Sequence, residues 1–195
     1  AHPSAGNHDN TLANALMYYY GSQNKPFVYR CINRLDRDTT GLTIVAKHAL
    51  AGGILGNAVA KRAIHRTYYA VCSGCTPACM RISAPIARKD ASTIERCVDF
   101  KRGENAVTDF IRIKYNPDNN LSLVKLRLLT GRTHQIRVHM KYIGFPLIGD
   151  FLYNPDYTYI SRQALHSGRL VFTHPVTGQK MNLISDIPSD MKSLF

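Results

Sequence analysis

The sequence contains no tryptophan, few acidic residues and no long apolar run. Its 195 residues include 13 Asp and Glu against 25 Lys and Arg, which gives a formal net charge of +12. The apolar stretches are far shorter than the roughly 20 residues that a membrane span needs. No charged segment followed by a hydrophobic one marks the chain for export. We therefore expect a cytoplasmic protein.

Disorder is excluded as well, because 45% of the residues are hydrophobic and only 19% are charged, and such a chain can bury enough apolar surface to offset chain entropy. The length fits one domain, residues 1–195, and we expect a monomer. The chain opens at "AHPSAGN" without an initiator Met, so we expect its first strand to lie upstream.

The positive charge favours a polyanionic partner, above all nucleic acid. A protein that is basic but has no such partner is the alternative.

Five cysteines are present, and their odd number in a chain without an export signal favours reduced thiols over disulfides. Cys72, Cys75 and Cys79 form a C-x2-C-x3-C pattern, and Cys97 is a candidate fourth ligand for tetrahedral zinc. However, Cys72 falls within a strand-like run and no second CxxC pair follows. We therefore expect no metal, and the cysteine cluster stays open as the alternative.

Helices are expected over residues 11–20 and 48–63, and between a Thr133 cap and a Gly144 stop. Short β-branched or alternating runs predict strands, among them "LTIVAK" and "HRTYYAVCSG". The runs "AVTDFIRIKY" and "LSLVKLRLL" are joined by "NPDNN" and predict a hairpin. Strands outnumber helices and no βαβ rhythm persists. The expected fold is therefore α+β, a largely antiparallel mixed sheet flanked by helices and loops.

Two aspartates stand beside an apolar run in "INRLDRDTTGL". If this segment is extended, Asp36 and Asp38 lie on one side of the backbone, about 7 Å apart. Paired carboxylates at such distances can cleave glycosidic bonds. Acidic residues in a loop are more often solvated, so both a glycosidase site and a solvated loop remain open at this point.

A basic face is predicted on the third helix. His134 and Arg137 are three residues apart and Lys141 is four further on, so the three side chains share a face that can meet phosphate or carboxylate. His134 and His139 are five apart, which turns their side chains about 140° away from each other. These two histidines are therefore not expected to chelate a metal. A solvated basic stripe is the alternative.

Tyr68 lies in a strand-like run, just after the basic Arg66. An aromatic ring at such a place can stack on an unpaired base, which contributes about 1 to 3 kcal/mol. Because the chain has 11 tyrosines, a role in the core is the default expectation for any one of them.

Taken together, these segments resemble the RluA-type pseudouridine synthases. "NRLDRDTTGLTIVAK" is similar to the H-R-L-D-x-x-T-S-G motif of that family, and "LLTGRTHQIRVHMKYIGFPLIGD" to its G-R-T-H-Q-I-R-x-H and G-x-P-I-x-G-D motifs. "RTYYAVCSG", "ALHSGRLVFTHPVTG" and "AHPSAGNHDNTLANAL" also resemble family segments, in the same order. Asn33 stands where the family usually has His, and Thr40 where it usually has Ser. The S4 RNA-binding domain that many members carry has no counterpart in this chain.

The resemblance implies a cofactor-free isomerase that converts uridines of ribosomal or transfer RNA to pseudouridine. Asp36 would act at the ribose, Arg137 would keep that carboxylate ionised, and Tyr68 would stack on the uracil and accept its C5 proton. An unperturbed phenol is a weak base at pH 7, so stacking is the firmer expectation. The candidates for a phosphate track are Arg34, Arg37, Arg132, His134 and Lys141. A non-catalytic RNA-binding module is the alternative.

Overall fold

The computed structural model describes residues 9–195, so the "AHPSAGNH" start of the opening motif lies outside the described part. One large sheet carries the fold, with strand order β11-β10-β4-β9-β8-β5, and β2 pairs with β10 outside that path. The strands of this sheet are β2 (Thr40–Gly41), β4 (His65–Ser73), β5 (Cys79–Ser83), β8 (Val107–Asn116), β9 (Leu121–Leu128), β10 (Leu165–Thr173) and β11 (Lys180–Ile184). Within residues 9–195 only β2 and β10 pair in parallel. The predicted α+β fold is confirmed.

Two short ribbons complete the strands. β1 (Arg30–Cys31) pairs with β3 (Val45–Ala46), and β6 (Ile86–Arg88) pairs with β7 (Arg96–Val98). The strand predicted over "LTIVAK" is therefore reduced to two residues, because its partner β1 offers only two. The hairpin predicted from alternation is confirmed, since β8 and β9 are antiparallel neighbours.

The predicted helices are present as α1 (Leu12–Gly21), α2 (Ala49–Ala60) and α3 (Gln135–Tyr142), and a fourth, α4 (Ser189–Lys192), was not predicted. The expected cap of α3 was wrong by one residue. His134, in the left-handed region at φ 56°, occupies the N-cap instead of Thr133 and makes no side-chain capping bond. At the other end Gly144, at φ 85°, follows the helix as predicted.

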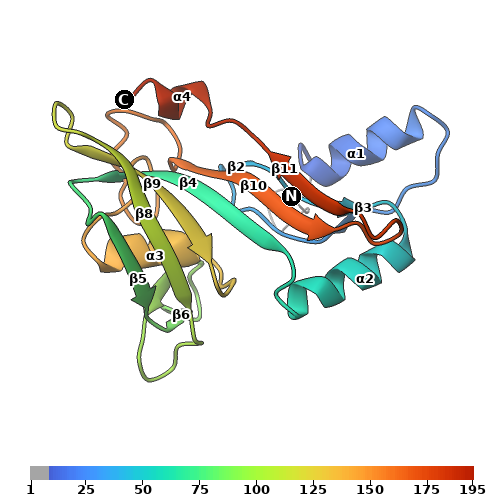
Figure 1. Ribbon diagram of the computed structural model, residues 1–195, viewed down its shortest axis with the longest axis horizontal. Helices are drawn as coiled ribbons and strands as arrows, with labels where there is room; N and C mark the ends of the chain where they lie inside the picture. Colours follow the sequence, from blue (N-terminus) through green and yellow to red (C-terminus); the bar gives the residue numbers. More distant parts are fainter. Residues whose placement is uncertain (1–8) are drawn as a thin grey trace.

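The molecule has two halves that the long strands β4 and β10 connect (Figure 1). One half holds α3 together with β5, β8 and β9, and its core includes Phe110, Leu126 and Met140. The other holds α1, α2 and the ends of β10 and β11, and its core includes Leu55 and Leu170. No helix in residues 9–195 is both long and apolar enough to cross a membrane.

Candidate active site

A cavity of about 880 Å³ lies between the two halves. Its walls come from three stretches of the chain, within residues 32–39, 59–68 and 127–137, and from Leu165 of β10. The aspartate-bearing motif, the tyrosine strand and the start of the "GRTHQIR" motif therefore meet in one place. The cavity brings together segments that lie up to a hundred positions apart in the sequence, as Asp36 and Arg137 do.

Arg137 is the buried cation of this cavity, with a side chain only 1% exposed. Its Nη1 donates to Asp36 Oδ2 at 3.3 Å, so the expected contact is present. Its stronger partner is Asp150, which accepts from Nε at 2.7 Å and from Nη2 at 2.8 Å. Burial opposes the charge on the guanidinium, but the bonds and negative charge of Asp150, with Asp36 adding to them, outweigh burial and raise the pKa of Arg137.

Asp150 was missed by the sequence reasoning, although it ends the "PLIGD" segment that resembles the family. Its side chain is fully buried, and Oδ1 also accepts from the backbone N–H groups of Leu152 and Tyr153. The preceding Gly149 has φ 67°, and a Cβ there would lie 2.1 Å from the carbonyl oxygen of Arg162. Only glycine allows this close approach, so the "GD" pair fixes the anchor of Arg137.

Asp36 lies in a turn and not in an extended strand. The N–H of Thr39 donates to the Asp36 carbonyl at 3.1 Å, and the buried Gln163 amide donates to the Arg37 carbonyl at 2.7 Å and to Thr39 Oγ1 at 2.8 Å. The Asp36 side chain stays 28% exposed and lines the cavity.

The expectation that Asp36 and Asp38 share one side was wrong. Asp38 adopts the left-handed conformation at φ 66°, which redirects the chain. Its carboxylate faces Arg37 at 3.4 Å, and it is absent from the lining of the cavity. The second carboxylate that binds Arg137 is Asp150, which accepts from Nε and Nη2 of the guanidinium and does not line the cavity.

Tyr68 lines the cavity from β4 and is 5% exposed. Burial raises the pKa of its phenol; the charge of Arg66 acts in the opposite direction and that of Asp36 in the same one. The hydroxyl therefore carries its proton at neutral pH in the free protein. A protonated phenol favours the predicted stacking role over the role of a base, and both roles stay predictions.

The candidates for the phosphate track are divided. Arg34, Arg132 and His134 line the cavity. Arg37 is 82% exposed beside Asp38, and Lys141 lies with its Nζ 5.6 Å from the centre of the Tyr153 ring. These last two side chains are outside the cavity.

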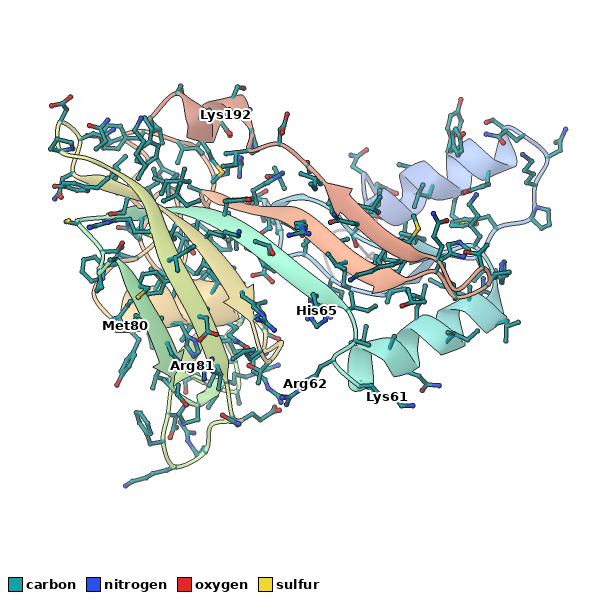
Figure 2. The ribbon with its side chains drawn as sticks, viewed as in Figure 1. Lys61, Arg62, His65, Met80, Arg81 and Lys192 are labelled. Atoms are coloured by element: carbon teal, nitrogen blue, oxygen red, sulfur yellow. The ribbon has the colours of Figure 1, made fainter. Side chains whose placement is uncertain are left out.

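Further basic residues of the cavity escaped the sequence reasoning. Arg62, His65, Arg66 and Arg127 all line the cavity. Figure 2 shows the Arg62 side chain pointing from the end of α2 across the gap toward the other half. Arg62 has φ 56°, at a position after a helix where glycine is usual. The available signal was the position of Arg62 just after a predicted helix.

Tyr153 was also missed, and it organises the predicted basic face of α3. Its hydroxyl accepts from the backbone N–H of Arg96 at 2.9 Å and lies 2.9 Å from His134 Nδ1. The guanidinium of Arg137 lies over the same ring, 5.0 Å from its centre. Burial lowers the pKa of His134, so this imidazole is neutral at pH 7. The face that was expected to meet phosphate is thus packed largely on a tyrosine.

The opposite face of α3 is a structural network. Gln135 donates to Thr108 Oγ1 at 2.9 Å and accepts from Thr130 at 2.8 Å. His139 is fully buried and lies 2.9 Å from both the Thr108 hydroxyl and the Ala84 carbonyl. A carbonyl can only accept, so Nε2 of His139 carries the proton and Nδ1 accepts from Thr108. The Gln and the second His of "THQIRVH" therefore hold the helix to the sheet.

The cysteines do not converge in the described part of the chain. Cys72 is buried in β4, Cys75 and Cys79 are exposed, and Cys97 is partly buried. Within residues 9–195 no group of three or more His, Cys, Asp or Glu side chains is placed to hold a metal ion. The alternative of a zinc site built from these four cysteines is therefore not supported.

Comparison with known proteins decides the family. The sequence matches the model of the RNA pseudouridylate synthase family over residues 2–142. The chain belongs to the RNA pseudouridylate synthase family. The resemblance found in the motifs is thereby confirmed.

Members of the family match this domain over its whole length. An uncharacterized RNA pseudouridine synthase of Bacillus subtilis, YjbO, is 42% identical across 99% of this chain and 68% of its own. The ribosomal large subunit pseudouridine synthase D of Zymomonas mobilis is 38% identical across 100% and 65%. The chain thus spans about two thirds of the length of these curated relatives. Among solved structures, human RNA pseudouridylate synthase domain containing 1 superposes with a TM-score of 0.78 at 26% identity, covering 91% of this chain and 74% of that one.

The two departures from the pseudouridylate synthase motif have structural roles here. Asn33 is buried, and its Oδ1 accepts from the Ile44 N–H at 2.8 Å. Thr40 Oγ1 lies 2.9 Å from His166 Nδ1, where β2 pairs with β10. Both residues hold the aspartate-bearing segment to its neighbours, and Asn33 also lines the cavity.

Proposed function

We propose that this domain isomerises uridine to pseudouridine in RNA, with Asp36 as the carboxylate that acts on the target nucleotide. One observation carries the proposal. Among the described residues that line the cavity, Asp36 is the one acidic side chain, and it lies in a wall that is otherwise rich in arginine and histidine. A polyanion is attracted to such a surface, and it delivers its sugar to the single carboxylate.

The chemistry needs few groups. The N1–C1′ bond of the uridine breaks, the uracil turns, and C5 forms the new bond to C1′; the C5 proton leaves and N1 ends protonated. Nothing is oxidised or reduced, so the reaction requires no cofactor for electrons. Asp36 serves as the nucleophile at C1′ or as the base that removes a ribose proton. In either role it must be anionic, and its contact with the Arg137 guanidinium at 3.3 Å suits a carboxylate.

The nucleotide must leave its stack to reach Asp36. Extrusion costs a few kcal/mol in a duplex and less in a loop, so a uridine in a single-stranded or looped region is the expected target. Tyr68 lines the cavity beside the aspartate segment and presents a ring on which the uracil can stack. Arg34, Arg132 and His134 are assigned to the neighbouring phosphates.

The substrate class follows from the relatives. Several are named for the large ribosomal subunit, so we infer ribosomal RNA as the first substrate to test and transfer RNA as the second. We also infer that residues 1–195 act as one domain, as a monomer in the cytoplasm. Size-exclusion chromatography with light scattering checks the oligomeric state.

The test is the Asp36→Asn variant, assayed by release of tritium from C5-labelled uridine in RNA. We expect turnover to be lost while RNA affinity and thermal stability stay close to wild type, because the amide keeps the shape and loses the reactive charge. Asp38→Asn is the matched control, two residues away and outside the cavity, and it should retain activity. Turnover by Asp36→Asn at the wild-type rate would refute the assignment.

Product analysis separates the rival functions. Pseudouridine has the mass of uridine, so conversion is seen as a chromatographic shift without a mass change. Release of free uracil, with dependence on both Asp36 and Asp38, would instead indicate a glycosidase. RNA binding without any product from the intact protein would indicate a binding module.

A further inference from the structure

A second groove, of about 460 Å³, adjoins the catalytic cavity. The two share Gly131, Arg132 and Thr133 in their lining. The far wall of the groove is the β6–β7 ribbon, which lies at the lower end of the half that holds α3 (Figure 1). The residues that line the groove are Ile86, Ala87, Arg88, Arg96, Arg102, Glu104, Gly131, Arg132 and Thr133. Four of these are arginines and one is acidic.

Two of the arginines oppose each other. Arg88 and Arg96 are directly paired in the register of the β6–β7 ribbon. Like charges placed directly opposite each other across two strands are destabilising, so this pair weakens the ribbon when nothing lies between the charges. The ribbon has only three residues on each side, so this repulsion falls on a short element. The pair is explained if an anion lies between the two guanidiniums.

The nearby carboxylates do not supply that anion. Three acidic side chains around the groove pair with other cations: Glu95 with Lys89, Asp99 with Arg102, and Glu104 with Arg132. Asp90, in the loop between β6 and β7, forms no ion pair with Arg88 or Arg96 within residues 9–195. Arg88 donates to the carbonyl oxygen of Ala91, and no ion pair is found for Arg88 or Arg96 within the described chain. The Nε of Arg96 is buried and has no hydrogen-bond partner there. The groove therefore has an unsatisfied donor as well as uncompensated charge.

The groove is built rigidly into the fold. A Cβ on Gly103 would lie 2.3 Å from the Asp99 carbonyl oxygen and 2.8 Å from the Pro85 side chain, so the loop that carries Arg102 packs directly on the start of the ribbon. The backbone N–H of Arg96 donates to the Tyr153 hydroxyl, which also contacts His134 in the catalytic cavity. The ribbon and the cavity are thus held in a fixed relation through one tyrosine.

We propose that this groove binds the RNA backbone next to the target nucleotide, with a phosphate held between Arg88 and Arg96. A phosphate offers acceptors to both guanidiniums and neutralises their repulsion. The shared residues Gly131, Arg132 and Thr133 make the groove continuous with the cavity, so a strand whose target base enters the cavity runs on into the groove. This inference rests on the proposed function, because it assigns the flanking part of the same substrate.

The experiment measures binding of a set of RNAs that extend from the target uridine by increasing lengths, first on the 5′ side and then on the 3′ side. Fluorescence anisotropy is read with proteins that carry Asp36→Asn, so that no product forms. In this background we expect affinity to rise as the RNA is lengthened on one side. With Arg88→Gln and Arg96→Gln added, that gain should be lost, by about tenfold for the two charge-assisted contacts.

Salt dependence gives a second readout. Each phosphate contact to a single strand contributes about 0.7 to the slope of log affinity against log salt, so loss of the one phosphate held by the two arginines should lower the slope by about 0.7. The matched control is Arg169→Gln. Arg169 is an exposed arginine on β10 that donates to Asn182 and lines neither cavity, and its removal should leave the length-dependent gain intact.

The melting temperature of the free double variant distinguishes phosphate binding from a structural role. If the two arginines bind phosphate, removing their like charges should leave the melting temperature unchanged or raise it. If they stabilise the fold, their removal should lower it. Equal affinity for all RNA lengths in the parent protein, or a length-dependent gain that survives in the double variant, would overturn the proposal. Because the readout is binding, RNA that binds with length dependence but is not converted by the protein with Asp36 intact would refute the proposed function and leave the groove standing.

Discussion

The two segments that meet in the cavity are held in very different ways. Arg137 comes from a helix whose other face is fixed by Gln135 and His139. Its own side chain is 1% exposed and forms two hydrogen bonds to Asp150. Asp36 comes from an irregular turn that is held by the amide of Gln163 and flanked by a two-residue strand. Its carboxylate has one contact to Arg137, at 3.3 Å.

The Arg137 guanidinium is thus held firmly, whereas the Asp36 carboxylate is held by a single weak contact. A guanidinium that is already neutralised by Asp150 stays in place whether or not Asp36 is bound to it. The Asp36 carboxylate is therefore free to leave its weak contact and reach the substrate without leaving an uncompensated buried charge behind. A site in which Arg137 had Asp36 as its sole partner would resist that movement, because breaking a buried pair is costly.

The largest expected effect comes from removing the anchor. Asp150→Ala leaves Arg137 buried without its main partner and should lower the free energy of unfolding by about 3 to 5 kcal/mol. Asp36→Ala should lower it by less than about 1 kcal/mol, because the remaining charge is still paired and the lost contact is partly solvated. Urea denaturation measures both. Comparable losses for the two variants would show that the contacts are equivalent; Asp150→Asn serves if the alanine variant does not fold.

A smaller effect is expected from loosening the turn. Gln163 is buried and bonds the Arg37 carbonyl and the Thr39 hydroxyl, while its own Oε1 has no partner within residues 9–195. Gln163→Met removes both bonds but also the unsatisfied oxygen, so stability should change little. Misplacement of Asp36 should lower kcat by about 10- to 100-fold, with KM for RNA nearly unchanged. Rising KM with constant kcat would place Gln163 in RNA binding instead.

The smallest expected effect is a pH dependence of stability that comes from His139 in α3. Burial lowers the pKa of His139, so the folded state keeps this imidazole neutral while the unfolded chain takes up a proton near pH 6.5. The stability that it contributes is complete above that pH and is lost as the pH falls through it toward the folded pKa. We expect a loss of about 1 kcal/mol from this residue between pH 7.5 and 5.5.

His139→Gln is the variant that checks this origin. The variant should have a lower free energy of unfolding at pH 7.5, but that free energy should fall less on acidification. The slope of unfolding free energy against pH should be smaller by the equivalent of one proton. An unchanged slope would mean that other groups, such as His134 and His166, whose pKa values are also lowered by burial, account for the acid sensitivity.

The sequence predicted the parts of the fold that depend on local pattern. Alternation of apolar and polar residues identified the β8–β9 hairpin, and the switch of period identified α3. The contact between Asp36 and Arg137 was expected from the family motifs, and it is present. Their catalytic roles, like that of Tyr68, stay predictions until variants are assayed.

What the sequence did not reveal depends on pairing between distant segments. Asp150 is unremarkable until Gly149 packs against Arg162, and Asp38 turns away only because its backbone enters the left-handed region. The cap of α3 was misassigned because Thr is a better capping residue than His in general, whereas here the chain needs a left-handed residue at His134. The opposition of Arg88 and Arg96 requires the register of a ribbon that no local pattern specifies.

The two long strands that connect the halves have a mechanical consequence. β4 and β10 pass from one apolar core to the other, and the register between them shifts between Ser167 and Arg169, close to where both strands border the cavity. Such an irregularity bends a strand and increases its local twist. A bend at this point sets the direction in which the strands pass from one core to the other, and with it the separation of the two walls of the cavity.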